Sequence, residues 1–178
     1  MGRAHYLLVD GYNVIHADRE MSGIAAYSLE AARVRLCDTL CEFKALTSYQ
    51  IIVVFDAHLV EGGVGSTADY HNIKIVFTKE AETADHYIEK SAYTLSRGTK
   101  KDRITVATSD LLEQIIIMGS GARRVSAGDL LTEIEQARAS MRARYLNNKP
   151  VKKNPISSLL DPETARKLDE MRYGKKNT

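Results

Sequence analysis

The chain has 178 residues, of which 44% are hydrophobic and 27% charged, a composition typical of one globular domain with room for an appendage. Its apolar runs fall short of the roughly 20 residues that cross a membrane, and Asp10 interrupts the first run too early for a signal peptide, so we expect a cytoplasmic protein. Cys37 and Cys41, the two cysteines, are too few for a zinc site and are predicted to be apolar helix residues.

Charge is distributed unevenly along the chain. Residues 1–120 carry 12 Lys and Arg against 16 Asp and Glu, whereas residues 121–178 carry 13 against 7. An acidic body with a basic C-terminal third is expected of a protein whose body binds cations and whose tail contacts a polyanion. Solvated helix faces rich in Lys and Arg would give the same bias, so charge alone does not decide between them.

Strands and helices alternate in the predicted chain. Runs of apolar and β-branched residues predict buried strands at 5–10, 51–56, 73–77, 104–110 (with its exit turn) and 123–125. Segments that begin at capping residues such as Ser28 and Ser126 predict helices at 28–46, 83–97, 111–118 and 126–146. The stretches 16–27 and 57–72 contain glycines and polar residues and are predicted to be a connection and a surface loop.

The C-terminal segment is predicted to be a basic extension. Residues 147–156 form a linker with two prolines. Asp161, Pro162 and Gly174 then bracket a final helix as its cap, first residue and stop. We therefore expect a main domain over residues 1–146 and an extension over residues 147–178.

The alternation predicts an α/β fold, a three-layer α/β/α sandwich around a mostly parallel, Rossmann-like sheet. In such sheets the functional site lies at the carboxyl ends of the strands. Asp10, Asp56 and Asp110 each end a predicted strand, and Asp85 lies in the first turn of the helix after the third strand. Four carboxylates are therefore expected to converge at one edge, with Gly11 turning the backbone after Asp10.

Such a cluster predicts a metal site. Any one of these residues could instead cap a helix or turn, but Asp10 precedes a glycine, and Asp85 and Asp110 lie inside helix starts, so caps explain the set poorly. Clustered carboxylates repel one another, and Mg²⁺ or Mn²⁺ prefers oxygen ligands. Two such ions can activate water and stabilise the leaving oxygen in phosphodiester cleavage.

Four motifs resemble a known family. They are the segments 8–13 (LVDGYN), 54–58 (VFDAH), 77–85 (FTKEAETAD) and 107–110 (ATSD). In this order they resemble the YacP-like branch of the NYN domains, within the PIN-like nuclease superfamily. The resemblance implies a Rossmann-like sandwich with an acidic, metal-binding edge.

The resemblance also implies residue roles. Asp10, Asp85 and Asp110 would form the acidic centre, Asp56 would be a fourth acidic position, and Asn13 would support Asp10. The implied activity is that of a metal-dependent endoribonuclease using Mg²⁺ or Mn²⁺. A member of the family is a ribosome-associated enzyme that cuts messenger RNA in the ribosomal A site, so mRNA and the ribosome are the implied partners.

Two other functions remain open from the sequence. One is a non-catalytic RNA-binding module on the same fold, and the other is a DNA-directed nuclease of the wider superfamily. The intact acidic set argues against the first, and the lack of long insertions for clamping a duplex argues against the second. The sequence does not indicate an oligomeric state.

Further residues are weaker candidates for RNA contact. Tyr12 could stack on a base or pack in the core, His58 could reach the groove or bond within a turn, and Lys79 could contact phosphate. Glu80 and Glu82 could extend the acidic rim or favour the helix start. Basic residues of the C-terminal third are candidates for RNA or ribosome contact, with solvated helix faces as the alternative: Arg123, Arg124, Arg138, Arg142, Arg144, Lys149, Lys152 and Lys153.

Overall fold

The computed structural model describes residues 4–56, 64–97, 102–108 and 122–147, together with residues 161, 163, 164, 166, 167 and 171. The chain divides into two compact units, residues 1–141 and 142–178. The predicted domain boundary at residue 146 stays a prediction. No helix among the described residues combines the length and apolar character needed to cross a membrane.

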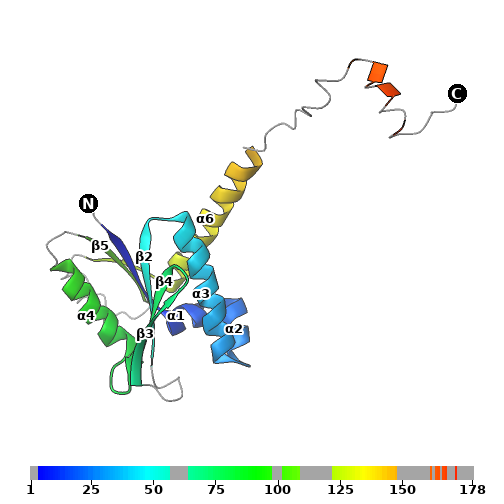
Figure 1. Cartoon of the computed structure of the whole chain (residues 1–178). Coiled ribbons are helices and arrows are strands. Elements are labelled where there is room, and N and C mark those ends of the chain that lie inside the picture. Colours follow the sequence, from blue (N-terminus) through cyan, green and yellow to red (C-terminus); the bar gives the residue numbers. More distant parts are fainter. Residues whose placement is uncertain are drawn as a thin grey trace. The chain divides into compact units, whose positions relative to one another are not determined.

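The described elements alternate much as expected (Figure 1). The strands are β1 (His5–Asp10), β2 (Tyr49–Phe55), β3 (Val64–Tyr70), β4 (Ile73–Lys79), β5 (Arg103–Ala107) and β6 (Arg123–Val125). The helices are α1 (Gly11–Ala17), α2 (Arg19–Ala25), α3 (Leu29–Leu46), α4 (Ala84–Ser96) and α6 (Ala127–Asn147). The predicted helix at 111–118 lies outside the described residues.

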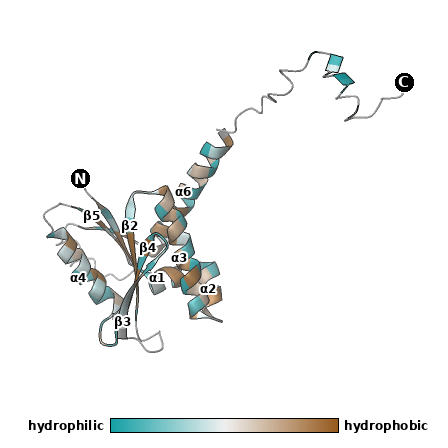
Figure 2. Ribbon diagram, viewed as in Figure 1, coloured by the Kyte–Doolittle hydropathy of each residue, from teal (hydrophilic) through white to brown (hydrophobic). Residues whose placement is uncertain are grey.

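The strands form one sheet in the order β3-β4-β2-β1-β5-β6. All neighbours are parallel except β3 and β4. Leu7 and Val9 of β1 face the core under α1, α2, α3 and α6, and Leu8 faces the core under α4. Figure 2 shows hydrophobic colouring along the central strands, as expected where both faces of a sheet are covered. The predicted three-layer α/β/α architecture is confirmed.

The prediction for residues 16–27 was wrong, because helices α1 and α2 occupy most of this stretch. Each is seven residues long, too short to show a clear amphipathic period. Asp10 caps α1 by accepting the Asn13 amide hydrogen, and Asp18 caps α2 by accepting that of Met21. Burial of Val14 and Met21 then holds the two short helices against the sheet.

The prediction of a loop over residues 57–72 was also wrong in its second half. Residues 64–70 form β3, an edge strand antiparallel to β4. Its small and polar sequence suits a strand with a neighbour on one side only. The hairpin closes through His71, which adopts a positive φ of 51°. Residues 57–63 lie outside the described residues.

The predicted helix caps are confirmed where the structure describes them. The Ser28 hydroxyl accepts the Ala31 amide hydrogen. Ser126 and Asp129 exchange hydrogen bonds at the start of α6, as a capping box does. In the C-terminal segment, the Asp161 carboxylate accepts the amide hydrogens of Glu163 and Thr164, as predicted for an N-cap.

Glycine is needed at position 11 because a larger side chain would not fit there, and not because the backbone makes a turn there. Its backbone is already helical, as the first residue of α1. A Cβ placed on it would overlap the ring of Phe55, the last residue of β2. Gly11 therefore contacts Phe55. Because Gly11 follows Asp10 and Phe55 precedes Asp56, the exits of β1 and β2 pack directly against each other.

This contact predicts opposite effects for the same substitution at two helical glycines. Gly11→Ala should lower the free energy of unfolding by about 1–3 kcal/mol, because the added methyl group forces Phe55 to move. Gly23→Ala should raise it by up to about 1 kcal/mol, because a Cβ there meets nothing within 4 Å and alanine favours a helix. Urea denaturation of both variants measures the difference, and a neutral Gly11→Ala would show that Phe55 does not constrain this position.

Candidate active site

Two of the four predicted carboxylates lie at strand exits, and a third lies at the start of the helix that follows a strand. Asp10 is the last residue of β1, and Asp56 directly follows the neighbouring strand β2. Asp85 lies in the first turn of α4, which follows β4 on the other side of β2. The carboxylates of Asp56 and Asp85 both raise the pKa of Asp10, as expected of groups that lie near it.

Asp10 is the most buried of the three, with 9% of its surface exposed. Its pKa is raised from the ordinary value of 3.8 to about 6, mainly because burial disfavours the charged form. The hydrogen bond from the Asn13 amide at 3.0 Å opposes this shift, and the neighbouring carboxylates of Asp85 and Asp56 add to it. Negative charge is therefore in excess at this edge.

Asp56 connects this edge to α4. Its Oδ1 accepts the backbone hydrogen of Ala84 at 2.5 Å, and Asp85 is the next residue. The Thr83 hydroxyl caps the same helix by accepting the His86 amide hydrogen. The position of Asp85 thus depends on the hydrogen bond that the preceding residue, Ala84, donates to Asp56.

Asp10 serves as a helix cap, contrary to our expectation that it fits this role poorly. The glycine that follows it begins α1 and does not form a separate turn. Asn13 contacts Asp10 through its backbone amide, which other residue types could also supply. The supporting role predicted for the Asn13 side chain stays a prediction.

The fourth predicted carboxylate, Asp110, lies outside the described residues. The described chain before it ends at Thr108, which is buried and whose amide donates to the Val125 carbonyl. Within the described ranges, no three Asp, Glu, His or Cys side chains form a group that could hold a metal ion. The donors that do approach one another are carboxylate oxygens, which suit Mg²⁺ or Mn²⁺.

Tyr12 is buried, with 5% of its surface exposed. Its ring packs edge-on against Phe55 at 5.2 Å, and its hydroxyl accepts a hydrogen bond of 2.9 Å from Arg33. This placement favours the packing role over base stacking, since a stacking ring must offer a free face.

The other candidates differ in exposure. Lys79, Glu80, Arg123, Arg142 and Arg144 are exposed, and Glu82 and Arg124 are half-buried. The Arg124 Nε atom is buried and has no hydrogen-bond partner among the described atoms. The remaining candidates, His58, Lys149, Lys152 and Lys153, lie outside the described residues.

Arg138 takes part in ion pairs within the protein. Its guanidinium group pairs with Glu42 on α3 and with Glu135 on α6, each at 2.7 Å. Because these two carboxylates occupy it, Arg138 is a poorer candidate for RNA contact than the exposed arginines of the same helix.

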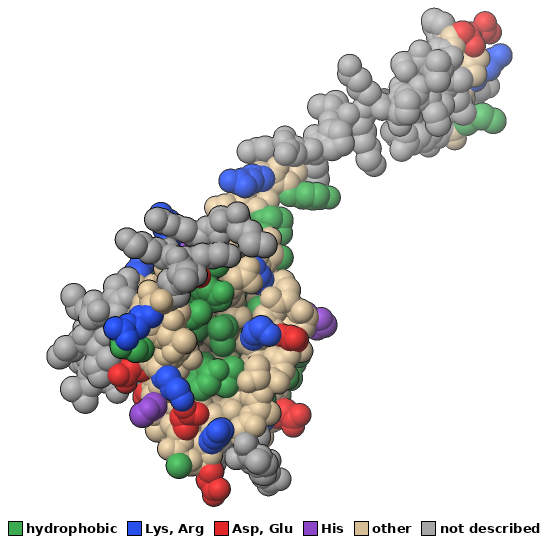
Figure 3. Space-filling model, turned by 60° about the vertical axis from the view of Figure 1, so that its left-hand side comes forward, with side chains coloured by type: hydrophobic (Ala, Val, Ile, Leu, Met, Phe, Trp, Pro, Cys, Tyr) green, Lys and Arg blue, Asp and Glu red, His purple; other side chains and the backbone are tan. Residues whose placement is uncertain are grey.

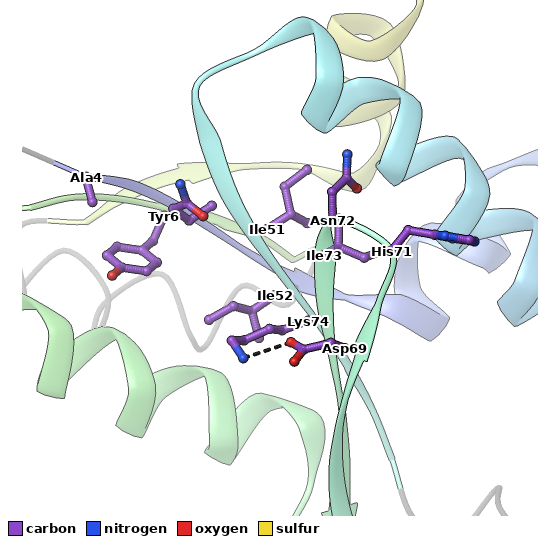
Figure 4. A pocket seen from close by; sticks show the side chains of 10 residues that line it. Ala4, Tyr6, Ile51, Ile52, Asp69, His71, Asn72, Ile73 and Lys74 are labelled. Atoms are coloured by element: carbon purple, nitrogen blue, oxygen red, sulfur yellow. Dashed lines mark hydrogen bonds and ion pairs between the residues drawn. The ribbon is translucent and has the colours of Figure 1, made fainter.

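A cavity of about 420 Å³ lies near the other end of the strands. Tyr6, Ile52 and the turn residues His71 and Asn72 line it, and Lys74 pairs with Asp69 beside it at 2.9 Å (Figure 4). The face turned forward in Figure 3 carries hydrophobic side chains in its middle, with charged side chains around them. Of the predicted catalytic residues that the structure describes, Asp10, Asn13, Asp56 and Asp85, none lines this cavity.

Comparison with known proteins identifies the family. A model of the YacP-like NYN domain matches residues 7–173. The chain belongs to the YacP-like NYN domain family. It is 44% identical to YacP of Bacillus subtilis strain 168 over 154 residues, which is 85% of this chain and 89% of that protein.

Two crystal structures of Rae1 (YacP) from Bacillus subtilis are also similar. One, of a mutant form of that protein, superposes with a TM-score of 0.67 at 37% identity, covering 94% of this chain and 99% of that one. Another structure of Rae1 gives a TM-score of 0.66 at 40% identity, covering 98% and 96%. Membership of the family implies a nuclease-type function.

The raised pKa of Asp10 predicts a pH-dependent effect of Asp10→Asn on the metal-free protein. The folded state holds the Asp10 proton more tightly than the unfolded state, so wild-type stability falls as pH rises from about 4 through about 6. Asparagine has no charge to bury and keeps the N-cap acceptor. The variant should therefore be more stable by roughly 3 kcal/mol at pH 7 and by almost nothing at pH 4.

Urea denaturation in EDTA across this pH range measures the effect. Asp18→Asn is the matched control, because Asp18 caps α2 through the same kind of hydrogen bond, to Met21 at 2.8 Å. An equal gain in both variants would show that capping, and not the carboxylate cluster, is responsible.

Proposed function

We propose that this chain is a metal-dependent endoribonuclease that hydrolyses phosphodiester bonds in RNA. The observation that carries the proposal is the approach of Asp10, Asp56 and Asp85 at the carboxyl edge of the sheet, in a member of the YacP-like NYN family. Burying like charges together costs stability. A protein that only held RNA would gain nothing from placing this charge against phosphates.

The proposed cofactor is Mg²⁺ or Mn²⁺, held by Asp10 and Asp85 with Asp110 and Asp56. The described donors fit such an ion chemically, because they are carboxylate oxygens. A cation would also offset the cost of burying the Asp10 carboxylate, which is the main cause of its raised pKa, and the repulsion from Asp85 and Asp56. When bound, such ions activate water and stabilise the leaving oxygen in phosphodiester hydrolysis.

The chain's own residues would position the reactants. Asp56 uses one oxygen to hold the Ala84 amide, so its other oxygen is the one proposed to bind metal or orient the attacking water. The Asn13 side chain is proposed to bond Asp10 or a phosphate oxygen. Lys79, exposed at the end of β4, is proposed to contact an adjacent phosphate.

The proposed substrate is messenger RNA, cut in association with the ribosome in its A site in the cytoplasm. This part of the proposal rests on the family resemblance of the four motifs and on the basic C-terminal third. Counter-ion release gives such a basic segment affinity for any polyanion, so ribosomal RNA is the expected contact.

The proposal predicts that removing single carboxylates abolishes cleavage without removing RNA affinity. Asp10→Asn and Asp85→Asn should each slow cleavage of a single-stranded RNA by at least about 100-fold in Mg²⁺ or Mn²⁺, because residues that ligate a metal directly matter at least as much as the residues that support them. EDTA should stop the wild-type reaction. Gel assays at matched protein and metal concentrations measure the rates.

Asp69→Asn is the matched control, because Asp69 is an exposed carboxylate on β3 that pairs with Lys74. It should cleave at the wild-type rate. Cleavage by Asp10→Asn as fast as by wild type would contradict the proposal. RNA binding without cleavage by the wild-type protein would favour the binding module, and preferential cleavage of DNA would favour the DNA-directed nuclease.

A further prediction concerns the ribosome. Arg142 and Arg144 are exposed on the second half of α6, and their joint replacement by glutamine should weaken co-sedimentation with ribosomes and reduce its dependence on salt concentration. Arg35→Gln is the control, because Arg35 is an exposed arginine engaged by Glu20. Undiminished binding by the double variant would mean that these arginines do not contact the ribosome.

A further inference from the structure

Arg33 is a cation in the apolar stripe of α3. Leu29, Leu36, Leu40 and Phe43 follow the four-and-three spacing of one helix face, and Arg33 occupies the remaining position of that series. The leucines and the phenylalanine belong to the core or pack against it. Arg33 itself is half-buried. A charged side chain at such a position is uncommon and calls for a specific role.

The contacts of Arg33 are with two aromatic residues. Its Nη1 donates to the Tyr12 hydroxyl at 2.9 Å, and its Cζ lies 6.0 Å from the centre of the Phe77 ring. Among the described residues, no carboxylate forms an ion pair with Arg33. The guanidinium group therefore joins the first turn of α1 to β4.

These two aromatic residues both pack against Phe55. The Tyr12 ring meets it edge-on at 5.2 Å and 66°, and the Phe77 ring stacks on it at 5.7 Å and 25°. Gly11 contacts the same ring directly. Phe55 thus lies among residues from α1 and β4, and Arg33 connects these elements from α3.

The acidic residues are attached to this group by single peptide bonds. Asp10 precedes Gly11, and Asp56 follows Phe55. A shift of Tyr12 away from Phe55 would change the separation of these two carboxylates. Both are already tied to amide hydrogens, of Asn13 and Ala84 respectively, so those hydrogen bonds would loosen as well.

We propose that Arg33 is a positioning residue of the acidic centre: by holding Tyr12 and Phe77 around Phe55, it fixes the relative positions of Asp10 and Asp56. The effect on metal binding and cleavage rests on the proposed nuclease function. The effect on the two carboxylates does not, and it can be measured in the metal-free protein.

Three substitutions test the role of Arg33 in the full chain. Tyr12→Phe removes only the hydroxyl acceptor and leaves the ring edge-on against Phe55. Arg33→Met removes the guanidinium group and keeps an apolar stem, whereas Arg33→Lys restores a donor but not the planar group over Phe77. Arg35→Met, two residues along the same helix at an exposed ion pair, is the control.

The first measurement is amide hydrogen exchange in EDTA. Exchange at Asn13 and Ala84 should quicken by about 3- to 10-fold in Tyr12→Phe and Arg33→Met relative to exchange at Val53 in the buried strand β2, because only local opening is affected. Arg33→Lys should give an intermediate change, and Arg35→Met none. Equal changes at all three amides, or no change, would overturn the positioning role.

The second measurement is Mn²⁺ affinity by calorimetry, followed by kcat and KM for RNA cleavage. The same two variants should weaken Mn²⁺ binding by about 10-fold, as loss of a supporting residue does, and lower kcat with little change in KM. A higher KM with unchanged kcat and unchanged exchange would show that Arg33 contacts RNA instead, and would overturn the proposal. A wild-type protein that neither binds Mn²⁺ nor cleaves would refute the nuclease function, while the exchange data would still decide the positioning role.

Discussion

The contact between the Gly11 backbone and the Phe55 ring is the constraint on which the acidic edge depends. A side chain at position 11 would push the β2 exit away from the β1 exit. With glycine at position 11, Asp10 and Asp56 lie at the ends of adjacent parallel strands, and packing in the interior fixes where these ends are. Protein interiors are close-packed and transmit small displacements. The positions of the carboxylates are therefore held by the packing of the core next to them.

The same packing creates an electrostatic cost. Asp10 is buried beside two other carboxylates, and its pKa of about 6 means that ionisation at neutral pH opposes folding. A divalent cation would convert this repulsion into attraction, so the folded protein and its proposed cofactor would be coupled thermodynamically. Stability lost at a functional site is commonly tolerated when the rest of the core compensates.

The long elements could be predicted from sequence, and so could the placement of Asp10, Asp56 and Asp85 near the carboxyl ends of the strands. Continuous β-branched runs such as residues 51–55 have few alternative structures, and Ser28 and Ser126 mark their helix starts by local hydrogen bonding. Helices α1 and α2 and strand β3 could not be predicted, because short elements have little periodicity and are stabilised by partners distant in sequence. Arg33 was missed for a related reason. Its position in the leucine series of α3 is visible in the sequence, but its partners Tyr12 and Phe77 are identified only by the fold.

Asp10 belongs at once to the helix start and to the acidic edge. Its Oδ1 accepts the Asn13 amide hydrogen that begins α1, while the carboxyl group as a whole carries the charge of the site. Selection for a well-folded chain and selection for the proposed activity would therefore act on the same few atoms. A replacement with neither acceptor nor charge, such as alanine, would confound the two, whereas asparagine separates them. Natural variation at this position would be limited even in a relative that had lost activity. An aspartate here is therefore weaker proof of catalysis than Asp85, which lies inside a helix that Thr83 caps.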